Sequence, residues 1–104
     1  MPGRLVSGKV MLNEEISVKY DVDVLVVGGG AAGVGAAVAA ARNGMNTLLV
    51  EREWSLGGLM TLGLVCYLGG YPEGVGRELL ERLEKEDGLN EGRICDPEKA
   101  KYVM

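Results

Sequence analysis

Residues 28–44, GGGAAGVGAAVAAARNG, place five glycines at the start of an alanine-rich segment. Glycine inside a helix costs roughly 1 kcal/mol relative to alanine, so this crowding needs a reason. Three of the glycines, Gly28, Gly30 and Gly33, have the spacing G-x-G-x-x-G. The preceding residues, VDVLVV at 22–27, are almost continuously apolar, as in a buried parallel strand. The pattern therefore predicts a strand, a glycine turn and a helix over about residues 30–43.

A second apolar segment, NTLLVE at 46–51, follows the predicted helix, which Asn43-Gly44 is expected to end. Strand, helix and strand within about thirty residues have the size of one βαβ unit, with parallel strands and a right-handed crossover. We therefore expect an α/β fold. It consists of a Rossmann-like βαβ unit with an incomplete parallel sheet, because two strands are too few for a doubly wound sheet.

The second half of the chain is predicted to add a glycine-rich loop and amphipathic helices. The loop spans residues 55–76, which contain too many glycines for a regular helix or strand. Residues 76–88, GRELLERLEKEDG, carry leucines at helical spacing on one face and charges on the other, and Gly88 is expected to end that helix. At 96–104, Asp96 suits the N-cap of a further helix.

Size and composition limit the possible functions. The 104 residues form at most one small domain, and we expect an N-terminal extension over 1–21 and the N-terminal part of a domain over 22–104 that continues beyond the chain end. The net charge of -4 does not favour nucleic acid, and the absence of histidine excludes a histidine-based triad. No metal-ligand spacing is present. Cys66 and Cys95 are interpreted as reduced residues packed in a cytosolic protein, and with no signal peptide or membrane span we expect a cytoplasmic location.

Phosphate binding at the start of the predicted helix would explain why glycines occupy these positions. Gly28 would permit the sharp turn, Gly30 would let a pyrophosphate approach the backbone, and Gly33 would let the helix pack tightly on the sheet. Small residues continue along one helix face at Ala37, Ala41 and Gly44. The N–H groups of the first helical turn would face the phosphates. The pattern therefore predicts a dinucleotide site.

Glu51 is the second feature of the sequence that indicates a dinucleotide site. It ends the second predicted strand, close to the offset of about 20 residues expected for the acid that binds the adenosine ribose. Its carboxylate would accept hydrogen bonds from the ribose and would repel a 2′-phosphate, which argues against NADP.

Three segments, YDVDVLVVGGGAAGVGAAVAAARNGMNTLLVERE (20–53), LGGLMTLGLV (56–65) and CDPEKAKYVM (95–104), resemble the N-terminal portion of FAD-dependent oxidoreductases. The resemblance implies a Rossmann domain of the glutathione reductase and fumarate reductase type, FAD as cofactor and hydride transfer with a small-molecule substrate. It also implies that the second glycine pair runs beside the cofactor, where the hydroxyl of Thr61 can meet it. The candidate cofactor-binding residues are Gly28, Gly30, Ala31, Ala32, Gly33, Glu51, Arg52, Gly57, Gly58 and Thr61.

Other interpretations stay open. In an NAD-binding dehydrogenase, Gly57-Gly58 would be only a turn. A nucleotide-binding module without redox turnover, an inactive fragment, or a flavin-fold enzyme without net redox chemistry would also fit. A disulfide reductase is disfavoured because no C-x-x-x-x-C motif follows the glycine pair. We expect catalytic residues beyond Met104 and weak FAD binding by an isolated fragment. Tyr67, Tyr71 and Arg77 are interpreted as structural or rim residues, and the substrate and oligomeric state are left open.

Overall fold

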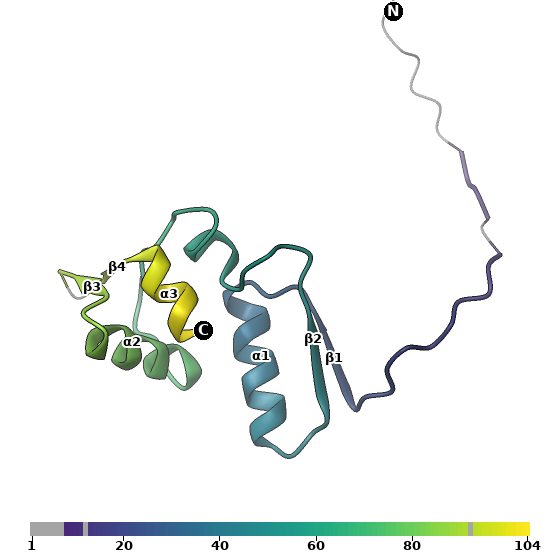
Figure 1. The fold of residues 1–104 in the computed structure, drawn as a ribbon, viewed down its shortest axis with the longest axis horizontal. Helices are drawn as coiled ribbons and strands as arrows, with labels where there is room; N and C mark the ends of the chain where they lie inside the picture. The colour runs from purple at the N-terminus through teal and green to yellow at the C-terminus, as the bar shows by residue number, and fades with distance from the viewer. Residues whose placement is uncertain (1–7, 12, 92) are drawn as a thin grey trace, which may run out of the picture.

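A parallel strand pair and the helix that connects it form the first part of the molecule. The computed structural model describes residues 8–11, 13–91 and 93–104. Strand β1 (Val24–Val27) pairs with β2 (Thr47–Val50) in parallel, and helix α1 (Ala31–Arg42) joins them. In Figure 1, α1 lies beside the two strands along its whole length. The predicted Rossmann-like βαβ unit is therefore confirmed.

Helix α1 ends where the sequence predicts. Asn43 is its C-cap, and the side-chain amide of Asn43 donates a hydrogen bond to the carbonyl of Ala39 at 2.8 Å. Gly44 follows with a positive φ of 82°, a conformation common one residue past a helix end. The chain then turns back and enters β2.

The second part of the molecule consists of short elements. They are the 3-10 helix η1 (Gly58–Met60), helix α2 (Val75–Lys85), strands β3 (Leu89–Asn90) and β4 (Ile94–Cys95), and helix α3 (Pro97–Val103). Asp96 caps α3 as predicted, since its carboxylate accepts hydrogen bonds from the backbone N–H groups of Glu98 and Lys99. The antiparallel β3–β4 pair was not predicted. These elements lie on the side of α1 opposite the β1–β2 sheet (Figure 1).

The buried core of the described residues lies in this second part. Leu83, on the apolar face of α2, is fully buried, as is Ala100 of α3. The remaining members of the cluster are Met60, Cys66 and Cys95. Full burial of a leucine side chain contributes about 1.5–3 kcal/mol. The apolar face of α2 is thus covered by α3 and by the loop after η1.

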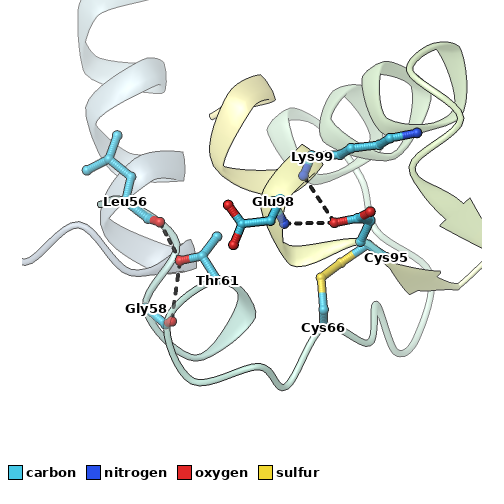
Figure 2. The surroundings of a disulfide bond; sticks show 8 residues. Leu56, Gly58, Thr61, Cys66, Cys95, Glu98 and Lys99 are labelled. Carbon is cyan, nitrogen blue, oxygen red and sulfur yellow. Dashed lines mark hydrogen bonds between the residues drawn. A yellow bond between two sulfur atoms is a disulfide. The ribbon is translucent and has the colours of Figure 1, made fainter. Parts of the chain in front are cut away.

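The interpretation of Cys66 and Cys95 as two reduced residues is wrong. The two cysteines form a disulfide, with their Cα atoms 5.2 Å apart (Figure 2). The pairing follows from the fold, because β4 runs beside the segment after η1, where the N–H of Cys95 donates a 2.9 Å hydrogen bond to the carbonyl of Cys66. Because the two cysteines are 29 residues apart in the sequence, no local pattern predicts that they lie close together.

The predicted N-terminal extension lies only partly within the described residues, because 1–7 and 12 fall outside them. The described residues before Val24 form no helix or strand, and most of their apolar side chains are exposed; Ile16 and Val18 are examples. In Figure 1 this segment runs away from the rest of the chain. Among the described helices, none combines the length and the apolar character required to cross a bilayer.

Candidate functional site

The turn between β1 and α1 is tight because glycines occupy its critical positions. Gly28 has a φ of +101°, which side chains other than glycine rarely tolerate, and its N–H donates to the carbonyl of Val50 at 2.8 Å. A Cβ on Gly33 would overlap the carbonyl oxygen of Gly28. The first turn of α1 therefore packs directly on the turn that precedes it, as the spacing of these glycines predicts.

The N-terminus of α1 has the properties of an anion site. Gly30 is the N-cap in extended conformation, and no side chain in the described part of the chain caps the helix. Apart from Gly30 and its two neighbours in the chain, no described residue has an atom within 4 Å of the position that a Cβ on Gly30 would occupy, and Ala31 and Ala32 are exposed. The first N–H groups of a helix lack intrahelical partners, and the helix dipole favours negative charge there. A phosphate group therefore has both room and hydrogen-bond donors at this end.

Glu51 is anchored beside the turn. One carboxylate oxygen accepts a hydrogen bond from the N–H of Gly29 at 2.5 Å, and the other accepts from the N–H of Glu53 at 2.8 Å. These bonds, that from Glu53 first, lower the pKa of Glu51 below its ordinary value. A carboxylate has about four acceptor positions, so capacity remains for ribose hydroxyls. The acid is thus ionised and fixed next to the glycine turn.

The second glycine pair contacts the first glycine turn directly. Gly57 has a φ of +102°, and its N–H donates to the carbonyl of Gly29 at 2.8 Å. Gly30 and Gly57 form a parallel β-bridge. A Cβ on Gly58 would lie 3.3 Å from the Cα of Gly30, so the two backbones approach closely. Glycines about 30 positions apart in the sequence are therefore held together by direct backbone contact, with Gly29 and Gly57 buried and Gly30 and Gly58 partly exposed.

Two residues of the predicted set take no part in the contact between the glycine loops' backbones. Thr61 is fully buried, and its hydroxyl donates to the carbonyl of Leu56 at 2.5 Å, as Figure 2 shows. The side chain of Arg52 is 91% exposed and pairs with Glu53 at 3.0 Å. The structure therefore brings together the glycines, the first residues of α1 and Glu51, while Thr61 lies beneath the second glycine loop.

Sequence reasoning missed three residues that shape the site. Gly29 is buried and supplies both a donor to Glu51 and an acceptor to Gly57. The side chain of Leu56 lies over Gly29, where a Cβ would come within 2.5 Å of it, and Met104 lies beside Gly57. The uninterrupted run of three glycines at 28–30 was a signal for Gly29, whereas nothing local marks the other two.

The polar residues of the glycine-rich stretch have structural contacts. Arg77 forms an ion pair with Glu73 one turn earlier. The guanidinium of Arg93 lies 5.7 Å from the ring centre of Tyr71. Tyr67 forms an isolated β-bridge with Ile94. The interpretation of Tyr67, Tyr71 and Arg77 as structural or rim residues stays a prediction.

The sequence of this chain is similar to those of known proteins. Residues 23–104 match the model of the family described as FAD dependent oxidoreductase. The chain is 32% identical over 93 residues to a digeranylgeranylglycerophospholipid reductase of Picrophilus torridus, covering 83% of this chain and 21% of that protein. It is 49% identical over 47 residues to one component of the ferredoxin:CoB-CoM heterodisulfide reductase of Methanosarcina acetivorans, covering 45% of this chain and 6% of that protein.

No solved structure gives a significant match. In the two relatives named above, the matched residues span about a fifth of the length of the Picrophilus torridus protein and a much smaller share of the Methanosarcina acetivorans protein. The family match covers most of the chain, including both glycine loops and helices α1, α2 and α3. Together with the glycine turn, the uncapped helix start and the anchored acid, it shows that the chain belongs to the FAD-dependent oxidoreductase family.

Proposed function

We propose that this chain holds the ADP part of FAD for two-electron transfer to or from a small-molecule substrate. The observation that carries the proposal is the meeting of the two glycine loops. Gly57 is hydrogen-bonded to the turn that leads into the uncapped N-terminus of α1. A simple βαβ nucleotide site requires the first loop alone. The second loop brings a further stretch of glycine backbone next to the pyrophosphate position.

Each part of the site has a role that follows from its chemistry. Gly28, Gly30 and Gly33 leave space for the pyrophosphate, and the N–H groups at Ala31 and Ala32 are donors toward it. Glu51 accepts hydrogen bonds from the adenosine ribose. Arg52 lies next to this acid and provides an exposed positive charge at the rim.

The second loop continues the site. The partly exposed Gly58 places backbone alone against the cofactor, and the buried Gly57 joins the two loops. Thr61 belongs to the site through the loop that it supports. When bound, FAD supplies the hydride-transfer chemistry, while the residues of this chain bind and orient it. Catalytic residues of the whole protein lie elsewhere in this proposal.

The substrate stays open. The names of the two relatives specify a heterodisulfide and a digeranylgeranylglycerophospholipid, which are chemically unrelated. The matched residues span only a small share of either relative, and in this chain they carry the proposed cofactor site. We therefore propose a redox role and assign no substrate class.

The direct test is the visible spectrum of the protein purified at its natural length. We expect a flavin absorption band that bleaches on chemical reduction and returns in air. A colourless protein that takes up NAD but not added FAD would contradict the proposal and favour a dehydrogenase. A bound flavin that cannot be reduced and reoxidised would instead indicate a nucleotide-binding module without redox turnover.

The domain division and the location belong to the same proposal. We propose residues 22–104 as the N-terminal part of the FAD-binding domain, preceded by the extension at 1–21. A cytoplasmic location stays a prediction, and the Cys66–Cys95 disulfide provides its test, because disulfides persist mainly in oxidising compartments. Rapid alkylation of intact cells should trap two free thiols if the protein is cytoplasmic, and should trap the disulfide if it is not.

A further inference from the structure

The buried hydroxyl of Thr61 is linked to the proposed phosphate site by a short series of contacts. The side chain is fully buried, and its hydroxyl lies 2.5 Å from the carbonyl oxygen of Leu56 and 3.5 Å from that of Gly58. These two carbonyls flank Gly57 in sequence. Figure 2 shows the hydroxyl between them, on the inner side of the loop.

The same side chain fills the space beneath Gly57. A Cβ on Gly57 would overlap the methyl group of Thr61 and come within 2.7 Å of its oxygen. Gly57 in turn donates to the carbonyl of Gly29 at 2.8 Å, and the N–H of Gly29 donates to Glu51. The Thr61 side chain therefore helps to fix the position of the Gly57 backbone. Through the hydrogen bond of Gly57, it also affects the position of the Gly28–Gly30 turn.

We propose that Thr61 is a positioning residue, which holds the Gly57-Gly58 loop against the Gly28–Gly30 turn through its hydroxyl and so sets the affinity for the pyrophosphate part of the cofactor. The inference rests on the proposed FAD-binding function. Complete burial places the hydroxyl out of reach of the pyrophosphate itself, so its action runs through Leu56, Gly57 and Gly29.

The test compares FAD and ADP binding by variants of the protein purified at its natural length and freed of flavin. Thr61→Val keeps the shape of the side chain and removes the hydroxyl, which leaves the carbonyl of Leu56 without its side-chain donor. We expect both dissociation constants to rise by the same factor, about tenfold, as for loss of one buried hydrogen bond. Thr61→Ser keeps the hydroxyl and should bind both ligands nearly as tightly as the unchanged protein.

Thr47→Val is the matched control. The Thr47 hydroxyl also donates to a backbone carbonyl, that of Met45 at 3.0 Å, but at the start of β2, the end of the strand remote from the glycine loops. This variant should leave both dissociation constants unchanged. If Thr61→Val does not fold, the pair Thr61→Ser and Thr61→Ala, which differ only in the hydroxyl, replaces it, and the alanine variant should bind both ligands more weakly.

Several outcomes would overturn the inference. Equal binding by Thr61→Val and the unchanged protein would show that the hydroxyl does not position the loop. Weaker binding of FAD with unchanged binding of ADP would place the effect outside the pyrophosphate site. Failure of both the valine and the alanine variants to fold would mean that the hydroxyl supports the whole fold. If the unchanged protein binds no FAD, the proposed function itself fails, and the two failures are thereby distinguished.

Discussion

The two halves of the molecule differ in how clearly the sequence predicts them and in how much buried core they contain. The βαβ unit at 22–51 carries a sequence signature that specifies each turn, yet α1 has no fully buried residue and Val27 of β1 is 79% exposed. The part at 58–104 carries a weak signature, yet it holds the buried cluster and the disulfide. The first half is thus specified by backbone geometry and the second by packing. The residues of a binding site can therefore be predicted from the sequence even where the packed core beside the site cannot.

The largest effect that tests this contrast is expected from Leu83→Ala. Leu83 is fully buried at the centre of the second half, so its truncation should lower the free energy of unfolding by about 2–5 kcal/mol. Leu25→Ala in β1 is the control, because Leu25 is 56% exposed and should lose about 1 kcal/mol or less. Urea unfolding measures both values. Equal losses would contradict the assignment of the core to the second half.

Removal of the disulfide should have the next largest effect. The Cys66→Ser, Cys95→Ser double variant opens a loop of 29 residues, which costs about 3.6 kcal/mol in unfolding free energy by the chain-entropy estimate. Hydrogen exchange should show the loss of protection mainly in α2 and α3, and much less in α1.

Two checks accompany the disulfide variant. A dithiol reductant should destabilise the unchanged protein and leave the double variant unaffected. Two free thiols in unreduced, denatured protein would show that the pair is not oxidised in solution, and the second half would then depend on its apolar cluster alone.

Gly33→Ala tests the first half. A Cβ there would overlap the carbonyl of Gly28, so we expect a loss of about 2 kcal/mol in unfolding free energy and weaker FAD binding. Gly35→Ala is a matched control in the same helix, since nothing outside the helix lies within 4 Å of the added atom. It should be neutral or stabilising by about 1 kcal/mol through helix propensity. Identical behaviour of the two variants would remove the argument for close packing at Gly33.

The smallest expected effect concerns the link between the halves. Glu78 of α2 forms ion pairs with Arg42 of α1 and with Arg82, both at 2.7 Å. These partners, Arg42 first, lower the pKa of Glu78 in the folded protein. The folded carboxylate therefore binds its proton less readily than the unfolded one. Its contribution to stability is present above the ordinary glutamate value of 4.5 and is lost as the pH falls through the lowered folded pKa.

Unfolding midpoints measured between neutral and acidic pH would detect this link. Glu78→Gln should be slightly less stable than the unchanged protein at neutral pH, and the two should converge in acid. High salt should reduce the difference, because the pairs are partly exposed. A difference that persists in acid would assign the effect of the substitution to packing instead of charge.

The sequence predicts those features that depend on neighbouring residues. The glycine turn, the ends of α1 and the Asp96 cap follow from local conformational preference, and all were found where expected. The β3–β4 pair and the disulfide depend on segments that meet only after α2 has packed, so no local pattern marks them. The burial of Thr61 is of the same kind, since its environment includes the loop above it and the residues packed around it.

The disulfide also determines how the chain responds to a single cut. Cys66 and Cys95 close the intervening residues, which include α2, into a covalent ring. A protease that cleaves one bond inside the ring, for example at the exposed Lys85, leaves both products attached to each other. Such a nicked molecule migrates as one species until it is reduced. Gels run without reductant therefore conceal nicking in this ring, whereas a cut before Cys66 releases a separate fragment.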